Sequence, residues 1–328
     1  MSIELNGAEF DLTALENSTK QVFYLTVKND LSMDLIKIPV LITKGVGAGP
    51  CLLVLGGVHG DEYEGPYAIK QLFDSIEPNS LSGTFIGIAR ANPPAMTTGT
   101  RESPIDHLNL ARVFPGDSTG TITEKIAHLI STKFINHSDF LIDLHSSGTN
   151  LSTPFLVGYD ATPKGRNSSR TAAMVFNAPV TWGHMALSEG RTVSYADSID
   201  VPWLYTECAG GGWLHIDQAK LYSDGVKNVM RQLHMIEGEI PPQQSVLHLL
   251  GDGDTDQSLS ATRSGYLISE VNLLSKVRRN QVLGRVLGPA GEVLEEITCP
   301  SEGIVILMRM TPSVMRGDPT YLVTGTLT

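Results

Sequence analysis

The sequence is poor in cysteine, in basic residues and in long apolar runs. Its 328 residues include three cysteines, Cys51, Cys208 and Cys299, which lie far apart. An odd, scattered set provides neither a disulfide framework nor a Cys-x-x-Cys zinc motif. Cysteines of this kind are typical of a protein in the reducing cytosol.

Basic residues are outnumbered by acidic ones. There are 24 Lys and Arg against 35 Asp and Glu, which gives a formal net charge of −11. Nucleic-acid binding without sequence preference needs a basic face that neutralises phosphates, so we expect no nucleic-acid partner. A small anionic substrate stays possible, because a few buried arginines are enough to bind it.

No apolar run reaches the roughly 18 residues of a membrane-spanning helix, so we expect no membrane partner. The N-terminal stretch carries acidic residues early and lacks a basic segment followed by a long apolar one, which argues against a signal peptide. We therefore expect a cytoplasmic protein. With 41% hydrophobic and 18% charged residues, the chain is expected to bury a large core.

Strands and helices alternate along the first 240 residues. This order predicts an α/β domain with a mixed, mostly parallel sheet flanked by helices. The apolar run "CLLVLGG" predicts a strand that is buried on both faces. Strands are expected within 21–44, 47–60, 83–94, 138–148 and 202–212, helices at 64–76, 122–135, 170–177 and 224–236, and a polar loop at 97–120.

Composition changes at "EGEIPPQQS", Glu237–Ser245, where two prolines indicate a linker. Beyond it, short apolar segments are broken by Gly, Pro and Asn, which predicts a small all-β domain. We therefore divide the chain into an α/β domain, residues 1–240, and a C-terminal domain of the barrel-sandwich type, residues 246–328.

Polar side chains follow three of the expected buried strands. His59 and Glu62 follow the first of these strands, His145 ends another, and Glu207 ends a third. Two histidines and a glutamate are a donor set of catalytic zinc, with a fourth position left for water. Glu207 is then the leading general base or acid. Taken singly, each residue also suits a structural role in a polar turn.

Five segments, taken in order, carry a family resemblance: "GGVHGDEYEG", "ARANPPAMTTGTR", "NLARVFPG", "DLHSSG" and "TECAGGG". The set, within Gly45–Gly212, resembles the succinylglutamate desuccinylase/aspartoacylase family of the zinc carboxypeptidase-like group. The resemblance implies a zinc carboxypeptidase-like fold in the larger domain. It also implies that His59, Glu62 and His145 bind Zn²⁺ and that Glu207 is the catalytic glutamate.

The resemblance further implies roles for two arginines. Arg101 falls near the family's arginine that stabilises an oxyanion or a substrate carboxylate, and Arg112 falls on the arginine of its Asn-Arg substrate-binding pair. The chain departs from the family here, since Ala111 replaces the asparagine of that pair. Asn109, two residues earlier, is the remaining amide and is assigned to substrate binding.

The sequence thus predicts a zinc-dependent amidohydrolase that deacylates an N-acyl amino acid or a related small N-acyl amine. N-acetylated diamino acids are one candidate substrate class. A carboxypeptidase-like peptide hydrolase and a non-catalytic small-molecule binding protein on the same scaffold are the alternatives. From the added β domain we also expect a homo-oligomer.

Overall fold

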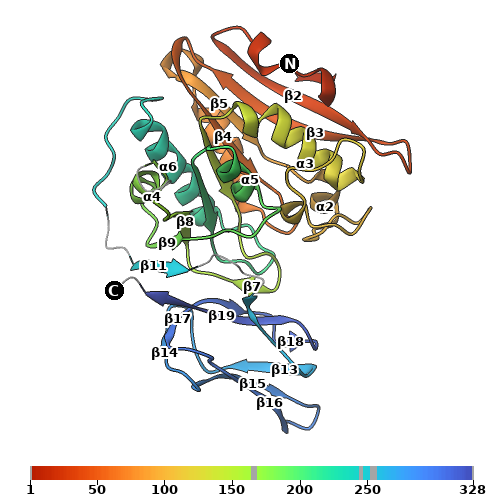
Figure 1. The fold of residues 1–328 in the computed structure, drawn as a ribbon, viewed down its shortest axis with the longest axis vertical. Helices are drawn as coiled ribbons and strands as arrows, with labels where there is room; N and C mark the ends of the chain where they lie inside the picture. The colour runs from red at the N-terminus through yellow and green to blue at the C-terminus, as the bar shows by residue number, and fades with distance from the viewer. Residues whose placement is uncertain (1, 164–167, 244–246, 252–256, 327–328) are drawn as a thin grey trace.

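Four parallel strands form the centre of a mixed β-sheet that has helices on both faces (Figure 1). They are adjacent in the order β5, β4, β6, β10, so the chain crosses over between them rather than forming hairpins. Their bounds are Gly47–Gly56 (β4), Ser82–Ile88 (β5), Phe140–Leu144 (β6) and Trp203–Glu207 (β10).

Further strands extend this sheet on both sides of its centre. On one side, β3 pairs with β5 and β2 pairs with β3, and both pairings are antiparallel. On the other side, β8 pairs with β10 in antiparallel orientation and β9 pairs with β8 in parallel orientation. The sheet is therefore mixed, as predicted. The bounds are Ser2–Asn6 (β1), Thr19–Lys28 (β2), Leu35–Lys44 (β3), Leu156–Asp160 (β8), Val180–His184 (β9) and Leu247–Gly251 (β11).

The helices form two layers, one on each face of the sheet. α1, α4 and α6 pack together on one face, and α3 and α5 cover the other. The bounds are Glu64–Ser75 (α1), Pro93–Thr98 (α2), Ile122–Lys133 (α3), Ser168–Phe176 (α4), Thr192–Ser198 (α5) and Ile216–Gln232 (α6).

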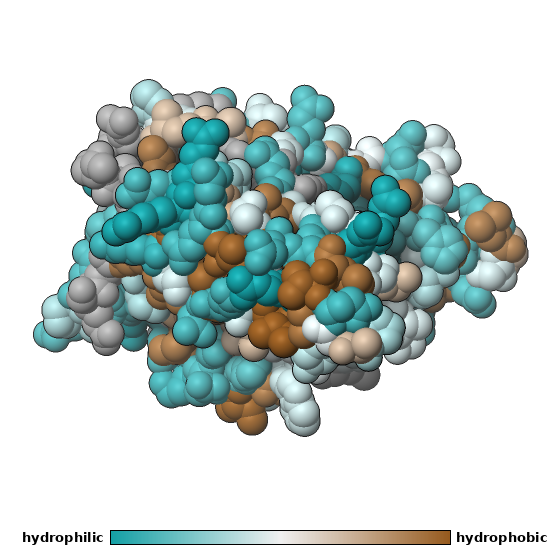
Figure 2. Space-filling model, turned by 90° about the horizontal axis from the view of Figure 1, so that it is seen from below, coloured by the Kyte–Doolittle hydropathy of each residue, from teal (hydrophilic) through white to brown (hydrophobic). Residues whose placement is uncertain are grey.

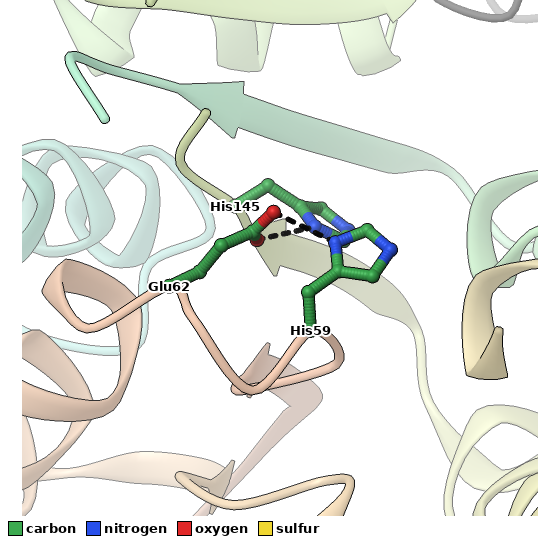
Figure 3. Close-up of side chains that lie close together, drawn as sticks. All are labelled: His59, Glu62 and His145. Carbon is green, nitrogen blue, oxygen red and sulfur yellow. Dashed lines mark hydrogen bonds and ion pairs between the residues drawn. The ribbon is translucent and has the colours of Figure 1, made fainter. Parts of the chain in front are cut away.

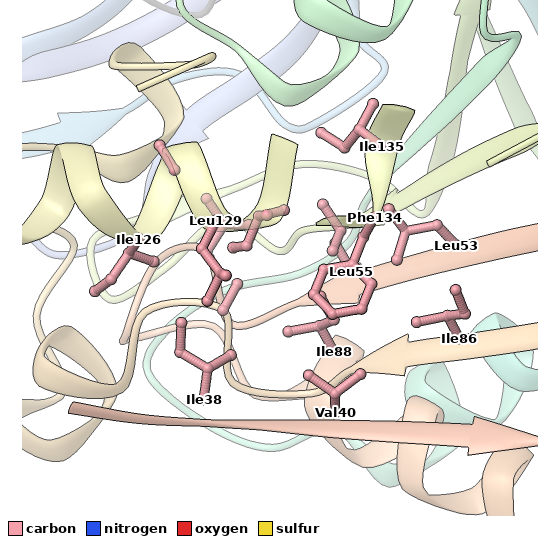
Figure 4. Packing of buried hydrophobic residues seen from close by; sticks show 14 of the residues in the cluster. Ile38, Val40, Leu53, Leu55, Ile86, Ile88, Ile126, Leu129, Phe134 and Ile135 are labelled. Atoms are coloured by element: carbon pink, nitrogen blue, oxygen red, sulfur yellow. The ribbon is translucent and has the colours of Figure 1, made fainter. Parts of the chain in front are cut away.

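The central strand β4 is buried on both faces, as its sequence predicts. Leu53 and Leu55 belong to the core under α3, which Figure 4 shows. Leu52 and Val54 point the other way, into the core under α1 and α6. Alternate residues of a strand face opposite sides of the sheet, so one apolar run supplies both cores.

Two expected segments differ from the structure. The helix expected at 224–236 is α6, which begins eight residues earlier at Ile216 and ends at Gln232. The expected loop at 97–120 overlaps the end of α2, which begins at Pro93, and contains a 3-10 turn at Leu110–Arg112. Proline is tolerated in the first helical turn, where its missing N–H removes no helical hydrogen bond.

The C-terminal part is all β, as predicted. A four-stranded sheet and a second group of strands share one apolar core, and both lie at the lower end of the view in Figure 1. The barrel-sandwich form stays a prediction. The bounds are Leu259–Ser260 (β12), Gly265–Ser269 (β13), Lys276–Val277 (β14), Val282–Leu287 (β15), Val293–Thr298 (β16), Gly303–Arg309 (β17), Ser313–Val314 (β18) and Pro319–Thr326 (β19).

The surface of this end carries some apolar side chains. Figure 2 shows them gathered near the middle of the face seen from below. The exposed large hydrophobic residues of β13 and β16 are Tyr266, Ile268, Val293 and Leu294. Nothing in these residues indicates what would cover them, so this face by itself identifies no partner.

The structure is a computed structural model that describes residues 2–163, 168–243, 247–251 and 257–326. Residues 244–246, at the end of the expected linker and the start of the expected second domain, lie outside this set. Within the described ranges, no helix has the length and apolar character needed to cross a membrane.

Candidate metal centre and active site

Three residues from two strand ends meet in one buried cluster. His59 and Glu62 lie in the turn between β4 and α1, and His145 directly follows β6. β4 and β6 are parallel neighbours, so their carboxyl ends deliver these side chains to the same edge of the sheet. Figure 3 shows both imidazole rings directed toward the Glu62 carboxylate.

The geometry of the cluster is close and convergent. His59 Nδ1 lies 2.7 Å from Glu62 Oε1, and His145 Nδ1 lies 2.9 Å from Glu62 Oε2. One ligand atom from each residue lies within 4.8 Å of the others. Two imidazoles and a carboxylate at this spacing are a group that can hold a metal ion.

The second nitrogen of each imidazole is held from outside the cluster. His59 Nε2 is 3.1 Å from Asn109 Oδ1, and His145 Nε2 is 3.0 Å from Asp143 Oδ2. Asp143 also accepts a hydrogen bond from the Thr192 hydroxyl. An outer acceptor of this kind fixes the ring orientation and leaves Nδ1 as the donor atom for a metal.

Burial and neighbouring charges shift the pKa of all three residues of the cluster. Burial and the Arg101 guanidinium lower the pKa of His59 to about 4, so this imidazole is neutral at pH 7. Burial disfavours charge on Glu62, but His59 and His145 hold the pKa of its carboxyl well below the usual range. Burial also opposes charge on His145, but Asp143 and Glu62 raise its pKa well above the ordinary value.

A cavity of about 60 Å³ opens beside the cluster. His59, His145, Arg101 and Glu207 lie in its wall, so the predicted base faces the same space as the two imidazoles. Burial and the Glu62 carboxylate raise the pKa of Glu207 to about 8. A carboxyl group with a pKa this close to neutrality is suited to accept and return a proton.

Arg101, for which the resemblance implied contact with an oxyanion or a substrate carboxylate, lies beside the cluster. Its Nη1 is 3.3 Å from His59 Nδ1 and 3.5 Å from Glu62 Oε1, and 43% of its side chain is exposed. A guanidinium this close to the imidazoles places a fixed positive charge beside the cluster.

Asn109 precedes the short 3-10 turn that contains Ala111, and Arg112 is the last residue of that turn. Arg112 lines the cavity, and its Nη1 donates to the Ala111 carbonyl at 2.9 Å. Asn109 is not among the cavity-lining residues, and its Oδ1 is shared between His59 and the Ala111 N–H. The structure therefore places Asn109 against a histidine of the cluster rather than in the substrate space.

Several cavity residues have no counterpart in the sequence prediction, among them Arg191 and Tyr205. Arg191 precedes α5 and Tyr205 lies two residues before Glu207 on β10, and both line the cavity. A Cβ at Gly190 would lie 2.3 Å from the Arg112 carbonyl oxygen, so this close approach brings Arg191 beside the Arg112 segment. For Tyr205, alternation along β10 from Glu207 was an available signal.

The family model for the succinylglutamate desuccinylase/aspartoacylase catalytic domain matches residues 48–233. A curated relative, the N-alpha-acetyl-L-2,4-diaminobutyric acid deacetylase of Halomonas elongata, is 32% identical over 90% of this chain and 87% of its own length.

Two solved structures match the fold of this chain over nearly its whole length. The succinylglutamate desuccinylase/aspartoacylase of Rhodobacter sphaeroides has a TM-score of 0.85 at 26% identity, covering 96% of this chain and 98% of its own. The product-bound ectoine utilization protein EutE (DoeB) of Ruegeria pomeroyi also has a TM-score of 0.85, at 27% identity, and covers 95% of this chain and 98% of its own.

The fold, the buried cluster and these relatives define the class of protein: a hydrolase that acts on an amide bond. More narrowly, the chain belongs to the succinylglutamate desuccinylase/aspartoacylase family. The family resemblance of the sequence is confirmed.

Proposed function

We propose that this chain is a zinc-dependent amidohydrolase that removes the acyl group from an N-acyl amino acid or a related small N-acyl amine. The observation that carries the proposal is the convergence of His59, Glu62 and His145 beside a cavity that also contains Glu207. The donor chemistry fits zinc, because two imidazoles and one carboxylate leave a fourth position for water.

Zinc held by this cluster would supply an activated water and polarise the amide carbonyl. Glu207 would take a proton from the attacking water and pass it to the leaving amine. Arg101 would face the negative charge that develops on the carbonyl oxygen. Arg112 would bind a substrate carboxylate through its planar guanidinium. The products are a carboxylic acid and an amine.

Within this class we propose an N-acetylated diamino acid as the substrate. The curated relative is named as a deacetylase of N-alpha-acetyl-L-2,4-diaminobutyric acid. Ala111 stands where the family resemblance expects an asparagine. It removes one polar group from the turn before Arg112, which supports a substrate different from succinylglutamate or N-acetylaspartate.

The metal content of the purified protein tests the proposal. We expect about one zinc per chain in the wild type and a loss of most of it in His59→Ala, since a ligand is removed. His137→Ala is the matched control, because His137 is exposed and lies outside the cluster. A wild type without bound metal would refute the proposed zinc dependence.

Glu207→Gln separates chemistry from metal binding. The variant keeps the shape of the side chain but cannot accept a proton, so zinc should stay while release of amine from N-acetyl-2,4-diaminobutyrate falls by at least about 100-fold. Amine release is followed with a primary-amine reagent. Retained turnover would remove Glu207 from its proposed role.

A further inference from the structure

We infer that Asp61 is a positioning residue of the metal centre, which holds the loop that begins at His145 against the turn that carries His59 and Glu62. The inference rests on the proposed function, because it concerns the same zinc site and the same reaction. Asp61 is not among the residues that line the cavity beside the cluster, so it acts through the loop and not on the substrate.

The three proposed ligands come from two separate segments of the chain. His59 and Glu62 lie in the turn after β4, whereas His145 begins the loop after β6 (Figure 3). The Glu62 carboxylate itself joins the two segments, since its Oε2 lies 2.9 Å from His145 Nδ1 and accepts from the Ser146 N–H at 3.2 Å. A ligating imidazole nitrogen carries no proton, so the hydrogen bond between Glu62 and His145 is lost once both bind a metal ion.

Asp61 joins the same two segments without using a ligand atom. Its Oδ2 accepts two hydrogen bonds from Thr149, one from the backbone N–H at 2.9 Å and one from the hydroxyl at 3.1 Å. The Asp61 residue is 8% exposed, so water competes little for these bonds. The contact between Asp61 and Thr149 therefore fixes the spacing of the two segments whether or not a metal ion is bound.

The loop after His145 is shaped to receive this carboxylate. Gly148 has a φ of 62°, in the left-handed region that favours glycine. A Cβ at Gly148 would lie 2.5 Å from Asp61 Oδ2, so any larger residue would push the carboxylate away. Glycine thus permits both the turn of the loop and the close approach of Asp61.

The same loop also holds the segment that carries the proposed base. The Ser147 N–H donates at 3.2 Å to the carbonyl of Cys208, the residue directly after Glu207, and the Ser147 hydroxyl donates to that carbonyl at 2.8 Å. The Gly211 N–H donates to the Gly148 carbonyl at 2.7 Å. Through this loop, Asp61 sets the distance of Glu207, as well as that of His145, from the turn after β4.

The test measures zinc affinity, by competition with a chromogenic chelator, and kcat and KM for N-acetyl-2,4-diaminobutyrate in the full-length chain. Asp61→Ala removes the acceptor, whereas Asp61→Asn keeps an oxygen that can accept from Thr149. Asp139→Ala is the matched control. Asp139 Oδ2 accepts from the Cys51 N–H at 2.8 Å, so the control removes the same kind of bond at the opposite end of the pairing between β4 and β6.

We expect Asp61→Ala to weaken zinc binding by about tenfold to 100-fold, the range for outer residues that orient metal ligands. In the zinc-loaded variant kcat should fall while KM changes little, because Asp61 does not line the cavity. Asp61→Asn should recover most of the zinc affinity, and Asp139→Ala should leave it unchanged. If Asp61→Ala fails to fold, Thr149→Val decides, since it removes the hydroxyl bond alone and should weaken zinc binding by about threefold.

An unchanged zinc affinity in Asp61→Ala, or in Thr149→Val where that variant decides, would overturn the inference and leave the proposed function intact. So would an equal loss in Asp139→Ala, which would mean a general effect of stability, or no recovery in Asp61→Asn. A wild type that binds no zinc would overturn both the inference and the proposed function.

Discussion

The residues of the buried cluster depend on outer polar contacts for their orientation. Asn109 and Asp143 each hold the far nitrogen of one imidazole, at 3.1 Å and 3.0 Å. These contacts direct both Nδ1 atoms toward Glu62. Orientation of this kind is a large part of metal affinity, because a freely rotating ring must lose entropy when it binds.

Asn109→Ala is therefore expected to weaken zinc binding by about tenfold, the usual effect of losing an outer contact to a ligand. Asn109→Asp is the matched control, since its carboxylate oxygen can still accept from His59 and from the Ala111 N–H. Competition with a chromogenic chelator measures the affinity. An unchanged zinc affinity with a raised KM would instead favour the substrate-binding role expected from the sequence.

Glu207 should make the metal-free protein sensitive to pH. Burial raises its pKa from 4.5 to about 8, so the folded state favours the neutral acid. The neutral Glu207 carboxyl adds to the free energy of unfolding. This contribution is fully present below pH 4.5, the pKa of the group in the unfolded chain, and is lost as pH rises through about 8, where the folded chain must hold the charge. Relative to Glu207→Gln, the wild type should lose on the order of 3 kcal/mol between about pH 5 and pH 9. Urea unfolding in a chelator tests this, and parallel pH profiles would contradict it.

The strand ends determine how much of the site the sequence can predict. His59, His145 and Glu207 follow or end segments with the pattern of buried strands, so their place at strand ends could be predicted, while their roles were implied only by the family resemblance. β8, β9 and the seven-residue α5 were not predicted, because short segments carry too little periodicity. Arg191 precedes α5 and was missed with it. The contact between Asn109 and His59 spans 50 positions, and no local pattern reveals it.

The pairing of β8 with β10 places Gly158 directly opposite Tyr205, which lines the cavity. A Cβ at Gly158 would lie 1.9 Å from the ring of Tyr205, so Gly158→Ala must push that ring or the strand aside. We expect a loss of about 2 kcal/mol from overpacking and a lower kcat/KM, because the ring moves within the cavity wall. Thermal unfolding and amine release measure the two effects.

Gly325→Ala is the matched control on β19, where a new Cβ would meet only the Leu250 carbonyl oxygen, at an ordinary 3.6 Å. It should leave stability and turnover nearly unchanged. If Gly158→Ala behaved in the same way, the packing of Tyr205 against β8 would not constrain the cavity.

At the scale of the whole molecule, the C-terminal strands are joined to the α/β sheet. β11 pairs with β9 on one side and β19 on the other, although it follows the expected linker. One buried cluster contains Trp182 of β9 together with Ile306 of β17. β7, Leu151–Ser152, follows the His145 loop and pairs with β17. The division at 240 and 246 stays a prediction, but these contacts favour cooperative unfolding.

Ile306→Ala tests this coupling, because it removes a fully buried side chain of the C-terminal part. We expect a loss of about 2 to 4 kcal/mol and one transition that moves as a whole. All three tryptophans, Trp182, Trp203 and Trp213, precede the expected linker, so their fluorescence reports on the α/β part. The fluorescence midpoint should fall together with the calorimetric one.

Val293→Ala, at an exposed position of β16, is the control and should change the free energy of unfolding by less than about 0.5 kcal/mol. Two calorimetric transitions, with the tryptophan signal unmoved, would mean that the parts unfold independently and that β17 does not stabilise the His145 loop.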